Sequence, residues 1–234
     1  MAKISIIGAG SWGTALGLLL CNNGHDVTIC SENKKEIESL KEHREHLTKL
    51  PGVKLPDAMK FTCDVRGSLS GKDILVMAKA SPYVRSTCRK YAADIPMGQM
   101  IVNVAKGVEA DTLMTMSQII EEEVPGANVV VLSGPSHAEE VGRGLPTTIV
   151  VGAHDRESAL YVQNVFKSPV FRVYTSPDIT GIELGGALKN VIALAAGTAD
   201  GLGYGDNTKA ALITRGIAEI ARLGTAMGAH AETF

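Results

Sequence analysis

The sequence lacks a strong excess of charge of either sign. Lysine and arginine together number 23 against 25 aspartate and glutamate residues, which leaves a net charge of −2. A chain without a basic field is not expected to bind nucleic acid or an anionic membrane surface. Apolar residues make up 45% of the chain, which is enough for a sizeable buried core.

Cysteine pairs with C-x-x-C spacing are also absent. The four cysteines are expected to be free thiols in a reducing compartment: Cys21, Cys30, Cys63 and Cys88. The sequence carries no credible targeting signal, so we expect a cytoplasmic location. His43 and His46 lie three residues apart, but their charged neighbours favour a solvated face, and we therefore expect no metal site.

Charged residues are missing altogether between Ile4 and Asn23. A signal peptide or a membrane span could produce such a run. Glycine recurs within it, however, and the helical part that begins near Trp12 is too short to cross a bilayer. We therefore expect no membrane insertion.

The same uncharged run contains a G-x-G-x-x-G motif formed by Gly8, Gly10 and Gly13. A β-branched run, Ile4–Ile7, precedes it, and apolar residues with helical spacing follow it. The first glycine makes a tight turn, the second lets the backbone approach a pyrophosphate, and the third lets the helix pack on the strand. Glu32 follows about 20 residues later, where an acid accepts from a ribose 2′-hydroxyl. This order predicts a dinucleotide-binding unit.

Strands and helices alternate along the chain as far as Tyr174. We expect strands at residues 26–30, 60–63, 73–78, 100–105, 129–132, 147–151 and 171–174, and helices near 34–46, from 82, and at 111–124 and 156–166. This alternation predicts a Rossmann-type, doubly wound α/β fold with a mostly parallel sheet and helices on both faces.

The pattern changes at Ser176, where we expect an N-cap followed by Pro177 at the first helical position. Two helices, at residues 180–199 and 208–223, are expected beyond it. We predict a dinucleotide-binding domain over residues 1–178 and the first helices of an all-helical, incomplete domain over residues 179–234. We expect the sequence to be a piece of a longer protein.

Three segments follow directly after predicted strands, at the edge where an open parallel sheet binds ligands. They are residues 80–82, 106–107 and 133–139, and the capping-box spacing of Ser136 and Glu139 predicts a helix start. Lys189 shares a helix face with small and apolar residues. We expect it to be partly desolvated, with a lowered pKa that suits proton transfer; the alternative is a lysine that reaches solvent. The glutamates at 121–123 are expected to face water.

These motifs together resemble those of the bacterial type of NAD(P)-dependent glycerol-3-phosphate dehydrogenase, along the whole chain. The matching segments are residues 8–13 (Gly-Ala-Gly-Ser-Trp-Gly), 104–107 (Val-Ala-Lys-Gly), 133–141, 183–191, 200–203 and 207–212. A departure occurs at residues 79–81, where Lys-Ala-Ser stands in place of the family's Val-Pro-Ser.

The resemblance implies roles for individual residues. Ser11, Trp12 and Ala138 would contact the cofactor. Lys106 would meet cofactor and substrate, Gly134 and Ser136 would contact the substrate, and Lys189 would be the catalytic acid/base. The implied reaction is reversible hydride transfer between NAD(P)H and dihydroxyacetone phosphate or sn-glycerol 3-phosphate, which supplies phospholipid synthesis. The family's sequence continues with further substrate ligands, so we expect this chain to bind cofactor but to be poorly active.

The cofactor is expected to be NAD or NADP. Glu32 would repel a 2′-phosphate, whereas Ser31, Asn33, Lys34 and Lys35 could bind one, and we lean slightly towards NAD. Glu32 and Asn33 are therefore included among the cofactor-binding residues. The resemblance also implies a small phosphorylated triose or glycerol as substrate, and a homodimer is possible. Two rival functions are a dehydrogenase for another hydroxy or keto acid and a nucleotide-sensing module without catalysis.

Overall fold

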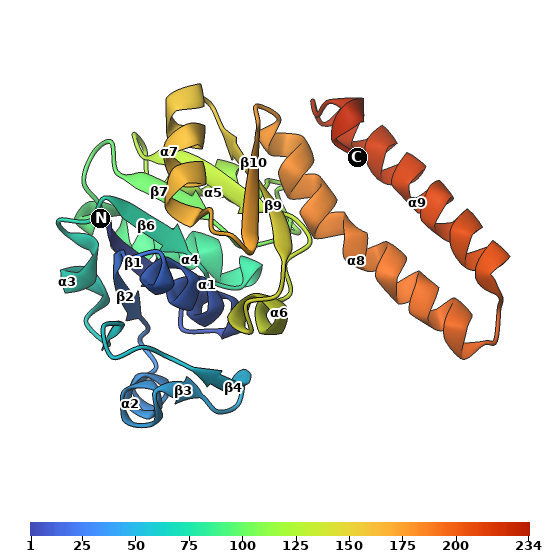
Figure 1. Cartoon of the computed structure of the whole chain (residues 1–234). Helices are drawn as coiled ribbons and strands as arrows, with labels where there is room; N and C mark the ends of the chain where they lie inside the picture. The colour runs from blue at the N-terminus through green and yellow to red at the C-terminus, as the bar shows by residue number, and fades with distance from the viewer.

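The computed structural model describes residues 1–234 and contains one eight-stranded sheet with helices on both faces (Figure 1). The strands lie in the order β10-β9-β8-β7-β6-β1-β2-β5. Their bounds are β1 Lys3–Ile7, β2 Asp26–Cys30, β5 Lys60–Thr62, β6 Ile74–Met77, β7 Met100–Asn103, β8 Asn128–Ser133, β9 Thr147–Ala153 and β10 Phe171–Ser176. Only the β8–β9 pairing is antiparallel, so the predicted mostly parallel Rossmann-type sheet is confirmed.

Each face of the sheet packs against its own set of helices. Ile4 and Ile6 of β1 belong to the apolar cluster under α1 and α7, whereas Ile7 belongs to the cluster under α3, α4 and α5. The helices are α1 Ser11–Asn22, α3 Val65–Leu69, α4 Val84–Tyr91, α5 Met116–Glu123 and α7 Arg156–Phe166. Because both faces are covered, the central strands are buried along nearly their whole length and are mostly apolar.

A small unit lies near the β5 edge of the sheet, at the lower left of Figure 1. It consists of α2 (Lys34–His43) and a hairpin of β3 (Glu45–His46) with β4 (Leu50–Lys54). His46 is buried there, with its Nε2 3.3 Å from the carboxylate of Glu36. The expectation that both histidines lie on a solvated face is therefore wrong for His46.

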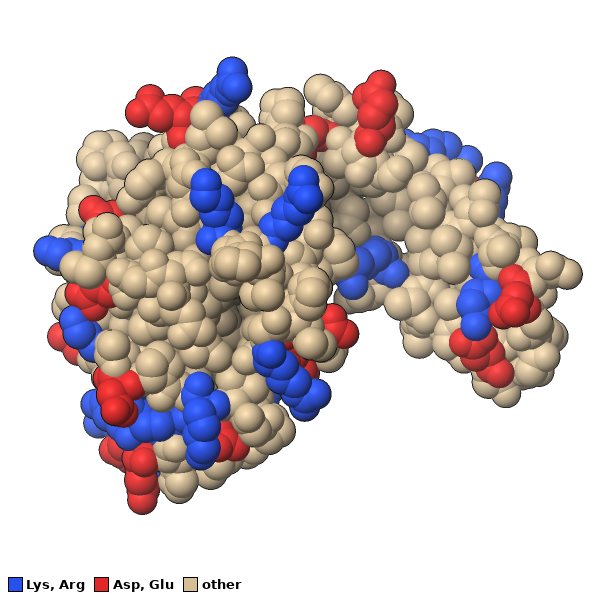
Figure 2. All heavy atoms as spheres, viewed as in Figure 1, with Lys and Arg blue, Asp and Glu red and all other residues tan.

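Two long helices, α8 (Ile179–Gly201) and α9 (Asp206–Ala226), form a hairpin that projects from the sheet (Figure 1). The first turns of α8 pack on β8 and β9, where Ile179 and Ile182 are buried. By length and composition alone α8 could cross a membrane, a test that core helices also pass. Figure 2 shows acidic and basic side chains interspersed over the visible face of the molecule.

The starts of two helices differ from the prediction. α5 starts at Met116 rather than at residue 111, because Thr115 and Gln118 form the capping box and Leu113 before them has a φ of 60°. The N-cap of α8 is Asp178, not Ser176; the Ser176 hydroxyl instead accepts from the Asp178 N–H. In both cases a nearby polar residue binds the free N–H groups better than the residue chosen from spacing.

Asp178 also joins the start of α8 to the end of the chain. Its Oδ1 accepts from Gly181 N at 2.9 Å, and its Oδ2 accepts from His230 N at 2.9 Å and from the Thr233 hydroxyl. We predict that Asp178→Ala lowers the free energy of unfolding by about 2–4 kcal/mol, because three donors lose a charged acceptor.

Urea denaturation followed by circular dichroism measures this change. Asp178→Asn is the matched control, because it keeps the oxygen that caps the helix and should cost about half as much. An unfolding free energy for Asp178→Ala equal to that of the unchanged chain would contradict the assignment.

Candidate active site

The turn between β1 and α1 is held by close backbone packing. Gly8 has a φ of +124°, and a Cβ there would lie 2.5 Å from the Ala78 carbonyl oxygen at the end of β6. A Cβ on Gly13 would lie 2.3 Å from the Gly8 carbonyl oxygen. Gly10, by contrast, has no atom within 4 Å of its Cβ position. The open space at Gly10 and the tight contacts at Gly8 and Gly13 match the three tasks assigned to these glycines.

This turn borders a cavity of about 560 Å³ at the ends of β1, β6 and β7. Gly10, Ser11 and Trp12 line one side of it, and Lys106 and Ala138 line another. The first turn of α1 contains no acidic residue, and the buried indole N–H of Trp12 has no hydrogen-bond partner. Free donors at a helix N-terminus suit an anionic ligand, so these residues fit the diphosphate of a dinucleotide.

Lys106 follows the end of β7, and its side chain extends across the rim of the cavity. Its ammonium donates to the Gly134 carbonyl oxygen and to the Ser136 hydroxyl, both at 2.9 Å. Burial, and then the positive charge of Lys189, lower the pKa of Lys106 to about 8. The structure therefore brings together Lys106, Gly134, Ser136 and Lys189, which the sequence placed on three separate segments.

The segment after β8 differs from its predicted form. α6 (Ala138–Gly142) begins with His137 as N-cap, and the Ser136 side chain caps nothing. The Ser136 hydroxyl donates instead to the Gly134 carbonyl oxygen while it accepts from Lys106. The predicted capping box is therefore wrong. Lys106, which follows β7, binds the Ser136 hydroxyl, and this hydroxyl does not cap α6.

Lys189 projects from α8 into a second cavity of about 650 Å³, which Gly134 and Ser133 also line. Its side chain is exposed, so the predicted partial desolvation of Lys189 is wrong; the desolvated lysine of the site is Lys106. α8 approaches β8 closely here, since a Cβ on Gly186 would lie 2.5 Å from the Ser133 hydroxyl. That hydroxyl is buried and has no hydrogen-bond partner.

A buried carboxylate, which the sequence analysis missed, ties α8 to the rest of the site. Glu183 is only 5% exposed; its Oε1 accepts from Asn103 Nδ2 and Ser117 N, both at 3.0 Å, and its Oε2 accepts from the Ser117 hydroxyl at 2.6 Å. Burial raises the pKa of Glu183 in spite of these bonds. Asn103 Oδ1 also accepts from Ala105 N, next to Lys106. One carboxylate thus links the helix that carries Lys189 to the strand end that carries Lys106.

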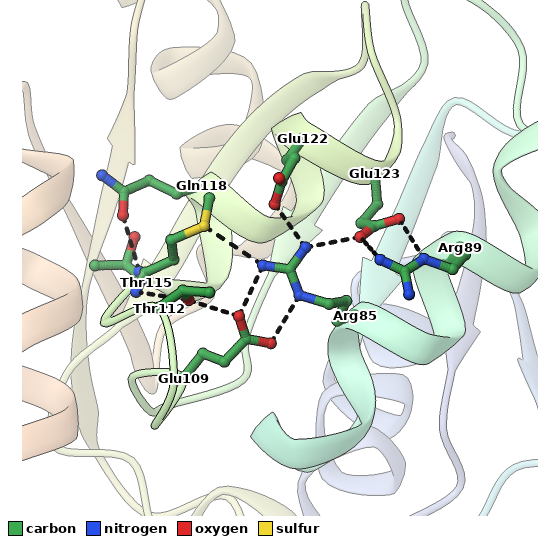
Figure 3. A network of polar contacts seen from close by, with 9 residues as sticks. Arg85, Arg89, Glu109, Thr112, Thr115, Gln118, Glu122 and Glu123 are labelled. Atoms are coloured by element: carbon green, nitrogen blue, oxygen red, sulfur yellow. Dashed lines mark hydrogen bonds and ion pairs between the residues drawn. The ribbon is translucent and has the colours of Figure 1, made fainter.

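An ion-pair network holds the loop that follows Lys106 and Gly107 (Figure 3). Arg85 of α4 binds Glu109 of this loop through two nitrogens, at 2.7 Å each, and also binds Glu122 and Glu123 of α5. The guanidinium of Arg85 lowers the pKa of Glu109 to about 2. The expectation that the glutamates at 121–123 only face water is wrong for all three, because Glu121 Oε1 also lies 2.8 Å from His154 Nε2.

The acidic residue at the end of β2 also has partners. Glu32 Oε1 accepts from the Lys90 ammonium and from the Tyr91 hydroxyl, both at the end of α4. Asn33 caps α2, and its Oδ1 accepts from Glu36 N at 3.3 Å. Both residues line a cavity next to the one at the glycine turn. Lys34 and Lys35 do not line it.

The fold, the glycine turn and the two converging lysines define a dinucleotide-dependent oxidoreductase with its site at the carboxyl ends of the strands. A family model described as the N-terminus of NAD-dependent glycerol-3-phosphate dehydrogenase matches residues 3–159, and the corresponding C-terminus model matches residues 178–234. The chain belongs to this family of glycerol-3-phosphate dehydrogenases.

Individual relatives and solved structures agree with this family assignment. The NAD(P)+ glycerol-3-phosphate dehydrogenase of Agathobacter rectalis is 63% identical over 234 residues, which are 100% of this chain and 70% of the relative. The corresponding protein of Fusobacterium nucleatum is 60% identical over 236 aligned residues, with 100% of this chain and 70% of the relative covered. A crystal structure of glycerol-3-phosphate dehydrogenase from Coxiella burnetii superposes with a TM-score of 0.94 at 32% identity, over 99% of this chain and 71% of that one.

We predict that Lys106 titrates near pH 8. Competitive acetylation of the lysines at a series of pH values, read by mass spectrometry, should show Lys106 becoming reactive well below the other lysines, whose ordinary pKa is about 10.4. Lys189→Met should raise the pKa of Lys106, because it removes a neighbouring positive charge. Lys209→Met is the control, since Lys209 lies on α9 and pairs with Asp200. If Lys106 titrates together with the exposed lysines, this description of its surroundings is wrong.

Proposed function

We propose that this chain carries out reversible hydride transfer between NAD(P)H and dihydroxyacetone phosphate or sn-glycerol 3-phosphate, and so supplies glycerol 3-phosphate for phospholipid synthesis. The observation that carries the proposal is that Lys106, which lines the cavity at the open glycine turn, binds Gly134, which lines the neighbouring cavity together with Lys189, in a chain of this family. The cofactor is NAD or NADP, as in the relatives' names.

Residues of the turn bind the cofactor in this proposal. The N–H groups of Ser11, Trp12 and Gly13 donate to the diphosphate, and the space at Gly10 admits it. Ala138, at the start of α6, borders the same cavity. The nicotinamide supplies the hydride when it is bound. The protein residues orient the two reactants and bring the charged groups to the reacting oxygen.

Lys189 and Lys106 have different roles in this proposal. Lys189 is the acid/base, which holds the proton exchanged with the oxygen on carbon 2 of the substrate. Lys106, with Gly134 and Ser136, positions the substrate. Because the pKa of Lys106 is about 8, an anionic substrate beside it favours its charged form and gains an ion pair in a partly buried site.

We also propose that the chain is divided into a dinucleotide-binding part and the beginning of a helical part. Residues 1–178 bind the dinucleotide, and residues 179–234 are the first helices of a helical part that binds the substrate. The chain spans about 70% of the relatives' length, and we propose that these 234 residues bind cofactor but turn substrate over poorly.

A cytoplasmic location agrees with four cysteines that form no disulfide. We propose a homodimer as the assembly to be tested first.

We predict that Gly10→Ala weakens NADH binding at least about tenfold without unfolding the chain, because the new methyl group meets the diphosphate and no protein atom. Fluorescence titration with NADH gives the dissociation constant, and thermal melting checks the fold. Gly197→Ala is the matched control, because its Cβ position in α8 is also free of contacts. Unchanged NADH affinity in Gly10→Ala would contradict the proposed diphosphate site.

We predict that Lys189→Met lowers kcat by about 10²- to 10⁴-fold in an enzyme of the relatives' full length, the range typical of a lost acid/base. NADH affinity should not change, because Lys189 does not line the cavity at the glycine turn. Lys209→Met on α9 is the control. A protein that only senses the nucleotide would keep its response in Lys189→Met, and full turnover in that variant would refute the assigned role.

A further inference from the structure

The ribose end of the site, at the carboxyl end of β2, carries an unexpected balance of charge. An acidic side chain in this position ordinarily accepts from the ribose 2′-hydroxyl and repels a 2′-phosphate. Glu32 occupies the position, so sequence alone favours NAD. In the structure, however, its Oε1 is already bound by Lys90 and Tyr91 of α4. The other carboxylate oxygen, Oε2, has no hydrogen-bond partner in the protein.

The negative charge of Glu32 is matched by lysine and not removed by protonation. The Lys90 ammonium and the Tyr91 hydroxyl hold the pKa of Glu32 below its ordinary value, so the carboxylate is charged at neutral pH. Tyr91 is buried, whereas the side chains of Glu32 and Lys90 are 51% and 53% exposed. An ion pair between half-exposed groups is weak, so Lys90 can turn to another anion at small cost.

The cavity around Glu32 contains more positive than negative charge. Lys49, Lys79 and Lys90 line it, and Glu32 is the only carboxylate among its lining residues. Lys49 pairs with Glu36, but Lys79 pairs with no carboxylate. Lys79 also lines the cavity at the glycine turn and therefore lies where the diphosphate and ribose ends meet. Lys79 is the first residue of the segment that departs from the family pattern.

From this arrangement we propose that Lys90, assisted by Lys79, forms a binding site for a 2′-phosphate monoester, and that Lys90 is the residue that lets this chain accept NADP as well as NAD. With NAD, the free Oε2 of Glu32 accepts from the ribose 2′-hydroxyl while Lys90 stays on Oε1. With NADP, Lys90 leaves Glu32 for the phosphate, and Tyr91 keeps the carboxylate hydrogen-bonded. The inference rests on the proposed function, because it places the ribose beside Glu32.

The test is a comparison of dissociation constants for NADH and NADPH, measured by fluorescence titration. The unchanged chain should bind both within about tenfold of each other. Lys90→Met should weaken NADPH binding about ten- to a hundredfold, the effect of losing a hydrogen bond between charged groups, and should change NADH binding little. In Lys90→Met with Glu32→Gln, NADPH affinity should recover in part, because the unpaired carboxylate is gone.

Lys35→Met is the matched control, because Lys35 is near Glu32 in sequence but does not line the cavity. Equal losses of NADH and NADPH affinity in Lys90→Met, or no loss of either, would overturn the inference and leave the proposed function standing. A selective loss of NADPH affinity in Lys35→Met would also overturn it. Failure of the unchanged chain to bind either nucleotide would overturn the proposed function and this inference with it.

Discussion

The site depends on how closely the start of α1 approaches the ends of β1 and β6. Gly8 and Gly13 leave no room for a side chain against Ala78 and against each other. This contact aims the N–H groups of the first turn of α1 into the cavity at the sheet edge. β6 pairs with β1, and β7 pairs with β6, so Lys79 and Lys106, which follow β6 and β7, lie around the same cavity. The order of strands in the sheet therefore places positive charge around the proposed diphosphate site.

The second half of the site is fixed by a buried carboxylate. Glu183 binds Asn103 and Ser117, and Asn103 in turn binds the backbone beside Lys106. Moving a carboxylate from water into the protein interior costs free energy, and the three hydrogen bonds that Glu183 accepts offset much of that cost. The result is a defined spacing between the segments that carry Lys106 and Lys189. The Arg85 network on the other side of the loop restrains Glu109 in a similar way (Figure 3).

Sequence reasoning succeeded where the signal is local. The strand Asp26–Cys30 and the helix Arg156–Phe166 have the predicted bounds, because burial on a sheet and an N-cap can both be read from neighbouring residues. It failed where a distant residue decides. Lys106 binds the Ser136 hydroxyl from the opposite side of the cavity. Arg85 and Arg89 bind the Glu123 carboxylate, and Lys90 binds the Glu32 carboxylate. The exposure of Lys189 and the burial of Glu183 likewise depend on how α8 leaves the sheet, which periodicity does not determine.

Cofactor binding in this protein rests on the first turn of α1, which we propose binds the diphosphate of a nicotinamide dinucleotide. Amide hydrogen exchange of this chain, measured with and without saturating NADH, checks this proposal. We expect the N–H groups of residues 11–13 to become strongly protected when the nucleotide is present, while α9 is unaffected. Binding of NADH without protection of these amides, or with protection confined to another part of the chain, would contradict it.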